Sequence, residues 1–118
     1  MLAISDSDIS LLEKKASKAA DMLKSLSNKW RLLILCQLVK GEKSVGELLE
    51  IVDLSQSALS QHLAVLRDSS LVTTRRESQS IFYSLKGEEA PVVLGALYQL
   101  YCAPADPRPK STKARRKS

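Results

Sequence analysis

The stretch from Ser44 to Leu85 constrains the fold of this chain more than any other part of the sequence. It reads SVGELLEIVDLSQSALSQHLAVLRDSSLVTTRRESQSIFYSL. Ser44, with Glu47 three positions later, is a capping box, because each side chain can bond to a backbone N–H at a helix start. The helix that begins there carries apolar residues at helical spacing, namely Val45, Leu48, Leu49 and Val52.

A second helix is predicted after a tight turn, with Ser55 as its N-cap. At about 100° per residue, Leu59, Leu63 and Leu66 share one face of this helix. The opposite face carries small, uncharged side chains at Ser57, Ser60, Gln61 and Ala64. Because a solvated face more often carries Glu and Lys, this composition favours contact with base edges in the major groove of DNA. Two positively charged strands follow, so the pattern predicts a helix-turn-helix with a wing. The alternative is two amphipathic helices and a hairpin in an ordinary small α+β domain.

The run S-Q-S-x-L-S-Q-H-L-x-x-L-R, with the arginine pair and the IFYSL segment behind it, resembles a known family. It is similar to the ArsR/SmtB-type winged-helix repressors of bacteria, and the resemblance extends from about Leu23 to Cys102. Two positions depart from the family pattern. Ser70 stands where a Gly usually ends the recognition helix, and the wing tip, residues 77–80, lacks the common Gly. The resemblance implies a sequence-specific DNA-binding transcriptional regulator that represses until an inducer arrives.

The segments before Ser44, and the segment between Leu85 and Cys102, are predicted to be mainly helical. Apolar residues at helical spacing predict a first helix from about Ser7 to Leu26. A second helix, from about Lys29 to Val39, is apolar nearly all round and is therefore expected to be buried, with Gly41 at its end. A last helix covers about residues 88–101. We therefore predict a mainly α winged helix-turn-helix fold with a small β-hairpin wing, in the order four helices, two strands and a final helix.

The last helix is unusually apolar. Between Val92 and Tyr101 only Gln99 is strongly polar. A terminal helix of this kind has more apolar surface than one small domain can cover, so we predict a homodimer through the first and last helices. A two-fold dimer would bind an operator that is a partial palindrome. The alternative is a monomer in which the last helix is simply central.

The composition is that of one soluble globular domain: 118 residues, 44% hydrophobic and 26% charged. We assign residues 1–104 to a winged helix-turn-helix domain for DNA binding and dimerisation, and residues 105–118 to a disordered basic tail. Six of the 18 basic side chains lie in the last eleven positions, which leaves residues 1–107 with a net charge of −1. No apolar run is long enough for a membrane span, and the acidic N-terminal region is unlike a signal peptide. These features predict a cytoplasmic protein with no membrane partner.

The candidate DNA contacts form two groups. On the recognition helix, the candidates for base edges and nearby phosphates are Gln56, Ser57, Ser60 and Gln61. In the wing, Arg75, Arg76 and Gln79 are expected to meet the backbone or the minor groove of double-stranded DNA. Arg67, at the end of the recognition helix, is a further candidate. His62 lies on the flank of that helix and is expected either to pack or to contact a phosphate.

The sequence lacks the parts of an enzyme. His62 is the only histidine, and no carboxylate pair or phosphate loop accompanies it. Many members of the resembling family bind metals through cysteine clusters in the third helix or through ligands in the last helix. Here the third helix has no Cys and the last has no His, so no metal and no cofactor are expected. A protein-binding or structural winged helix is the stronger alternative function.

The two cysteines, Cys36 in the second helix and Cys102 at the end of the last, fit no zinc spacing and no C-x-x-C motif. Their placement resembles the BigR, SqrR and HlyU branch of the family, which implies a dithiol that responds to reactive sulfur species or oxidants. On a helical wheel Cys36 shares an arc with Lys29 and Lys40, which would favour its thiolate. The alternative is that both cysteines are structural, buried small hydrophobic residues. The regulator would then act by competing with another DNA-binding protein.

Overall fold

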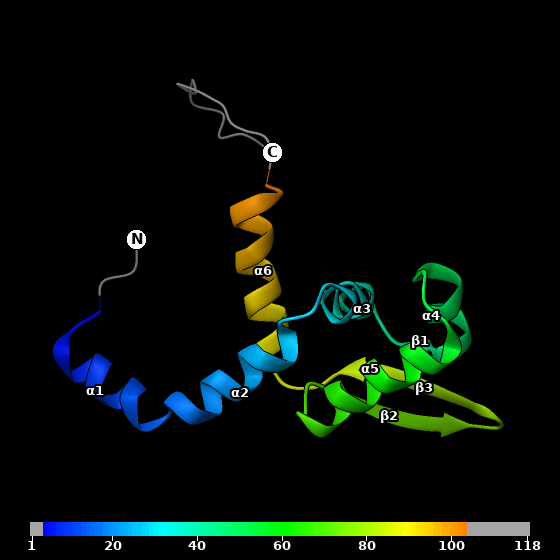
Figure 1. Cartoon of the computed structure of the whole chain (residues 1–118), viewed down its shortest axis with the longest axis horizontal. Helices are drawn as coiled ribbons and strands as arrows, with labels where there is room; N and C mark the ends of the chain where they lie inside the picture. Colours follow the sequence, from blue (N-terminus) through cyan, green and yellow to red (C-terminus); the bar gives the residue numbers. More distant parts are fainter. Residues whose placement is uncertain (1–3, 104–118) are drawn as a thin grey trace, which may run out of the picture. The chain divides into compact units, whose positions relative to one another are not determined.

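The computed structural model describes residues 4–103 and divides the chain into two compact units, residues 1–87 and residues 88–118. In the described residues, the first unit contains helices α1 to α5 and strands β1 to β3, and the second contains helix α6 (Figure 1). The basic tail predicted over residues 105–118 lies outside the described residues. The assignment of residues 1–104 to a single domain stays a prediction.

The first predicted helix is two helices. Helix α1 (Asp6–Lys14) begins with a capping box, in which the Ser5 hydroxyl accepts from the Asp8 N–H at 3.1 Å. The Lys15 N–H bonds to the Leu12 carbonyl at 2.9 Å, so the helical hydrogen-bond ladder tightens there. Helix α2 (Ala16–Leu26) continues beyond this break. The prediction of one continuous helix was wrong. Only Lys15 leaves helical geometry, and a break of one residue does not disturb the spacing of the apolar residues on either side.

Helix α3 (Lys29–Val39) has the predicted bounds. Its N-cap is Asn28, whose Oδ1 accepts from the backbone N–H groups of two residues in the first turn. Three of its residues are buried: Ile34, Leu35 and Leu38. In contrast, Leu33 is 42% exposed and Val39 is 55% exposed. The expectation of burial all round therefore does not hold in the described chain.

The helix-turn-helix follows. Helix α4 (Val45–Ile51) begins at the predicted capping box, since the Ser44 hydroxyl accepts from the Glu47 N–H at 3.1 Å and Glu47 Oε1 accepts from the Ser44 N–H at 2.8 Å. Helix α5 (Gln56–Asp68) begins at Ser55, whose hydroxyl accepts from the Ala58 N–H at 3.1 Å. Both predicted caps are confirmed. The apolar faces of these helices are buried, with Leu48, Leu59, Leu63 and Leu66 all at or below 1% exposure.

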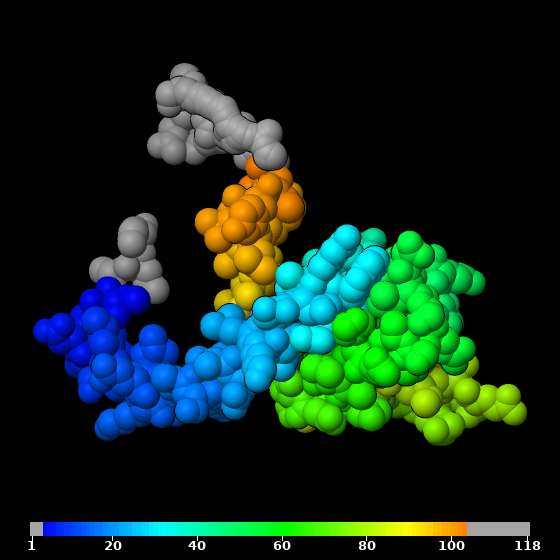
Figure 2. Space-filling view, viewed as in Figure 1, coloured from blue at the N-terminus to red at the C-terminus, as the bar shows by residue number. Residues whose placement is uncertain are grey.

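The wing is a hairpin of β2 (Val72–Glu77) and β3 (Ser80–Leu85). Glu77 pairs with Ser80, so the loop between the strands has two residues. A third strand, β1 (Lys43–Ser44), pairs antiparallel with β3 and gives the order β1-β3-β2. Strand β1 was not predicted, because two residues are too few to show the alternation of a strand. The tip of the hairpin projects from the body of the first unit (Figure 2).

Ser70 ends the recognition helix with a positive φ of 61°. Its N–H bonds to the Arg67 carbonyl, and the Leu71 N–H bonds to the Leu66 carbonyl, both at 3.0 Å. This is a Schellman motif, which normally takes Gly at the left-handed position. Ser78, at the wing tip, also has a positive φ, of 57°. The two positions that depart from the family's glycine pattern are therefore the two non-glycine residues with positive φ among residues 4–103.

Helix α6 (Glu89–Tyr101) forms the described part of the second unit. Its exposed large apolar side chains are Val92, Tyr98, Leu100 and Tyr101, the last two at 73% and 78% exposure. Neither α6 nor any other helix within residues 4–103 has the length and hydropathy that a membrane crossing requires.

Candidate nucleic-acid interface

The recognition helix α5 divides into a buried face and a polar exposed face. Its leucines pack into the core of the first unit, where α3, α5 and the hairpin contact one another. The rest of its surface exposes predicted DNA contacts from the first turn to the last: Gln56, Ser57, Ser60, Gln61 and Arg67. Uncharged hydrogen-bonding groups on the N-terminal half of such a helix are suited to base edges.

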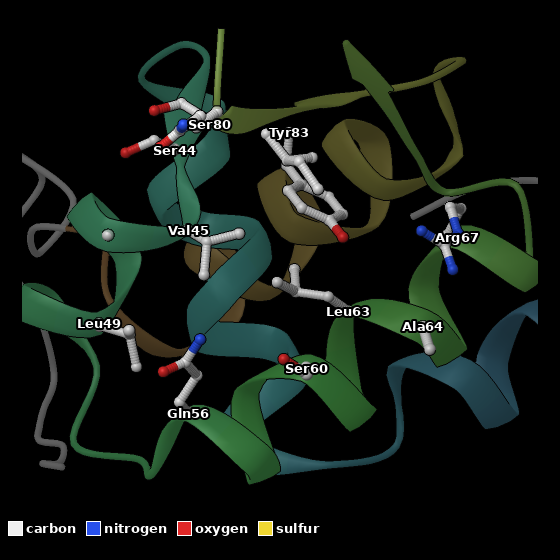
Figure 3. Close-up of a pocket in the computed structure, with 13 residues that line it drawn as sticks. Ser44, Val45, Leu49, Gln56, Ser60, Leu63, Ala64, Arg67, Ser80 and Tyr83 are labelled. Atoms are coloured by element: carbon white, nitrogen blue, oxygen red, sulfur yellow. The ribbon is translucent and has the colours of Figure 1, made fainter. Parts of the chain in front are cut away.

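A groove of about 570 Å³ lies between α4, α5 and the wing. It brings together four of the predicted DNA contacts, which are Gln56, Ser60, Arg67 and Gln79. In Figure 3, Tyr83 of β3 lies over Leu63 of α5, and Gln56 and Ser60 lie on the α5 side of the groove. Apolar and polar side chains from α4, α5 and the wing therefore line the groove together.

In the wing, Arg75 is engaged by carboxylates of its own chain. Its guanidinium donates to Glu42 at 2.7 and 2.9 Å and to Glu77 at 3.0 Å, and it lies over the Phe82 ring at 4.6 Å from the centroid. The hydrogen bond from Arg75 lowers the pKa of Glu42, and the two carboxylates raise the pKa of Arg75. A DNA phosphate would have to compete with these carboxylates for the charge of Arg75. The DNA contact of Arg75 stays a prediction, but Arg76 is the better candidate because neighbouring strand residues point to opposite faces.

His62 lies against Arg31 of α3. Its Nδ1 is 3.3 Å from Arg31 Nη1, and Arg31 Nε donates to the Ser25 carbonyl at 2.6 Å. Burial lowers the pKa of His62, and the positive charge of Arg31 lowers it further. The imidazole is therefore held neutral, which favours the packing role over the phosphate contact.

Sequence reasoning missed Arg31 and Glu42. Arg31 carried a local signal, since it is the one acidic or basic side chain between Trp30 and Val39 in an otherwise apolar helix. Glu42 carried none, because its partner Arg75 lies 33 positions further along the chain. The Glu42–Arg75 pair forms only because β1 and β2 both pair with β3 in the folded chain.

The two cysteines are both exposed. Cys36 lies on α3, and Cys102 is the C-cap of α6. Neither is the buried small hydrophobic residue that a purely structural role would require. Within residues 4–103, no three side chains among His, Cys, Asp and Glu gather in a group that could hold a metal ion.

Residues 28–74 match the bacterial regulatory protein family arsR. The chain is 50% identical over 91 residues to the transcriptional activator HlyU of Vibrio cholerae, which covers 77% of this chain and 84% of that protein. The chain belongs to the arsR family. It is also 43% identical over 105 residues to the biofilm growth-associated repressor of Agrobacterium fabrum, covering 89% of this chain and 90% of that repressor.

The solved structures give the same result. The transcriptional repressor BigR of Xylella fastidiosa superposes with a TM-score of 0.77 at 44% identity, covering 86% of this chain and 100% of BigR. Reduced HlyU of Vibrio cholerae superposes with a TM-score of 0.73 at 50% identity, covering 78% of this chain and 97% of HlyU. The winged helix-turn-helix fold is confirmed. The arsR family consists of DNA-binding transcriptional regulators, so the prediction of a regulator and not an enzyme is also confirmed.

Proposed function

We propose that this arsR-family regulator is a homodimeric repressor that leaves its operator when Cys36 and Cys102 are cross-linked by reactive sulfur species or oxidants. The observation that carries the proposal is the exposure of both thiols on a winged helix-turn-helix regulator. Lys29 and Lys40 are exposed at the start of α3 and at its C-cap, and they share an arc of the helical wheel with Cys36. A positive charge near a thiol favours its thiolate, which is the form that attacks sulfur electrophiles. The site of action is the cytoplasm.

In this proposal α5 enters the major groove and the wing meets the backbone or minor groove. Gln56, Ser57, Ser60 and Gln61 contact base edges and nearby phosphates, and Arg67 contacts phosphate. Arg76 and Gln79 anchor the wing, with Arg75 contributing once DNA competes for its guanidinium. The groove beside α5 supports a joint DNA surface of α5 and the wing, because it is lined by residues from both groups.

The homodimer is supported by apolar surface that the described protomer leaves exposed. On α1 this includes Leu11 and Leu12, at 57% and 56% exposure, and on α6 it includes Leu100 and Tyr101. A two-fold dimer places its recognition helices about one turn of DNA apart. The operator is then a partial palindrome with half-site centres ~10 bp apart or a multiple of that spacing.

The switch is ordinary thiol–disulfide chemistry. A cysteine thiolate attacks the sulfane sulfur of an organic persulfide, RSSH, and becomes a persulfide while RSH leaves. The second thiolate then attacks the inner sulfur of that persulfide, forming the disulfide and expelling hydrosulfide. The net reaction consumes two thiols and one RSSH and gives one disulfide, RSH and H₂S. A trisulfide consumes two RSSH and gives two RSH and one H₂S, and it spans a wider gap between the cysteines.

The alternative function is competition with another DNA-binding protein, without cysteine sensing. It is favoured by one observation: the relative HlyU is named an activator, whereas the Agrobacterium and Xylella relatives are named repressors. A regulator that displaces a repressor would bind promoter DNA in the same way and raise transcription.

The test measures DNA affinity before and after treatment. A duplex is selected from a random-sequence pool with the reduced protein, and its affinity is measured by fluorescence anisotropy after exposure to persulfide, peroxide or the matching thiol alone. We expect the reduced protein to bind and the treated protein to release, with mass spectrometry showing a link from Cys36 to Cys102 within one protomer. Cys36→Ser and Cys102→Ser should each bind DNA and lose the response. Release of DNA by either treated single variant would refute the cross-link as the switch.

A further inference from the structure

We infer that Arg31 is a positioning residue that holds the DNA-reading helix α5 at a fixed rotation against α2 and α3. Arg31 lies in the first turn of α3, where its own N–H is capped by Asn28. Its guanidinium makes two contacts in different directions: Nε donates to the Ser25 carbonyl in the last turn of α2, and Nη1 reaches His62 Nδ1 in the middle of α5. One side chain thus joins three helices.

Each contact gives a hydrogen-bond donor to an acceptor that has no partner inside its own helix. The Ser25 carbonyl is among the last four carbonyls of α2, which have no N–H partner inside their own helix. The His62 Nδ1 accepts a hydrogen bond only when the imidazole is neutral with its proton on Nε2. Burial and the charge of Arg31 favour this neutral form. A guanidinium with donors in a fixed fork suits two acceptors in different directions, whereas the ammonium of Lys is a point donor.

The same turn of α2 holds α5 at a second point. Ser25 is 7% exposed as a whole residue, and its hydroxyl is hydrogen-bonded to the Ser69 hydroxyl just past the end of α5. His62 and Ser69 are seven residues apart, which is about two turns and roughly 10 Å along one face of a helix. Two hydrogen-bonded attachment points on one face add directional restraints on the tilt and the rotation of α5 to the packing of its buried leucines.

Rotation matters more for base reading than for backbone attraction. The side chains of a helix end about 5–6 Å from its axis, so a rotation of about 20° moves them by about 2 Å. A displacement of that size breaks a hydrogen bond to a base edge. The attraction between basic side chains and phosphates falls off gradually with distance, so it persists after a displacement of about 2 Å. Loss of the Arg31 contacts should therefore reduce sequence discrimination and leave non-specific binding nearly unchanged.

The experiment compares Arg31→Gln and Arg31→Lys with Lys29→Gln, which removes one positive charge from the same turn of α3 without touching His62. All proteins are kept reduced, so the outcome is independent of the cysteine switch. Affinity is measured for the selected duplex and for a scrambled duplex of equal length, over a range of salt concentrations. We expect both Arg31 variants to lose about tenfold on the selected duplex, the value of one base contact, and to stay within about twofold on the scrambled one.

A double-mutant cycle separates positioning from general destabilisation. If Arg31 acts through His62, then Arg31→Gln with His62→Gln should lose little more specificity than either change alone. Ser69→Ala, which removes the second attachment and leaves Arg31 intact, provides a test if Arg31→Gln fails to fold, and it should lower the same affinity ratio. Equal loss on both duplexes, a salt slope reduced by about 0.9, and rescue by Lys would instead identify Arg31 as a phosphate contact and overturn the inference.

Discussion

Arg75 holds Glu42 through two hydrogen bonds across 33 positions of the chain, from Nε to Oε2 at 2.7 Å and from Nη2 to Oε1 at 2.9 Å. The pair ties β2 of the wing to the loop that precedes β1, and Phe82 supports the guanidinium from one side. The sequence offered Arg75 and Arg76 as equivalent wing cations. The structure makes them different, because Arg75 is already neutralised by carboxylates of its own chain.

Replacing Glu42 by Gln should therefore strengthen non-specific DNA binding. The change leaves Arg75 with only Glu77 as a carboxylate partner and makes its charge available to phosphate. The plot of log affinity against log salt should steepen by at most ~0.9, the value of one additional phosphate contact. Glu13→Gln, at an exposed position of α1, is the control for the change in net charge. An unchanged slope in Glu42→Gln relative to this control would mean that Arg75 does not reach DNA.

Gln61→Ala and Arg76→Ala should weaken binding in different ways. Gln61 is exposed on the reading face of α5, so its loss should lower affinity for the selected duplex and relax the sequence preference at one position. Arg76 lies on the exposed wing strand, so its loss should weaken all duplexes alike and reduce the salt slope by about 0.9. Parallel anisotropy titrations on selected and scrambled duplexes measure both effects. Identical profiles for the two variants would refute the division into readers and anchors.

Acidification should weaken the fold through His62. Its pKa in the folded protein lies below the ordinary value of 6.5, so the unfolded chain binds the proton more readily. The stabilisation by the neutral imidazole is fully present above pH 6.5 and is lost as the pH falls through the lower folded pKa. Urea unfolding between pH 7.5 and 5 should show this loss, and His62→Gln should show a smaller one. A His62→Gln variant with the same pH dependence as the parent protein would assign the effect to other groups.

Ser70→Gly should stabilise the protein. At a φ of 61° a residue with a Cβ is strained, and Gly removes that strain at a modest cost in unfolded-chain entropy. We expect a gain of about 0.5–1 kcal/mol in the free energy of unfolding, measured in urea at fixed protein concentration. Ser70→Ala keeps the strain and should give no gain. A destabilised Ser70→Gly would show that the serine hydroxyl contributes more than its backbone strain costs.

Local patterns in the sequence were sufficient for the helix-turn-helix and its caps. Ser44, Glu47 and Ser55 act within three residues of themselves, so their hydrogen bonds depend on no distant segment. The buried face of α5 was equally readable, because leucines at helical spacing have one way to be buried. The motif was specific enough to indicate the family, and it also suggested the candidate DNA contacts on α5, which stay predictions.

Only the tertiary structure decided which charged side chains are engaged by groups of their own chain and which are available to a partner. The pairing of Glu42 with Arg75 and the contacts of Arg31 with Ser25 and His62 join segments that are between 6 and 33 positions apart. The short strand β1 and the break at Lys15 also lacked a periodic signal. Sequence by itself determined most of the helices, the hairpin and the buried face of α5, because those depend on local periodicity and hydrogen bonding. The fold decided which charges neutralise one another, because Coulomb interactions and hydrogen bonds depend on distance in space and not on separation along the chain.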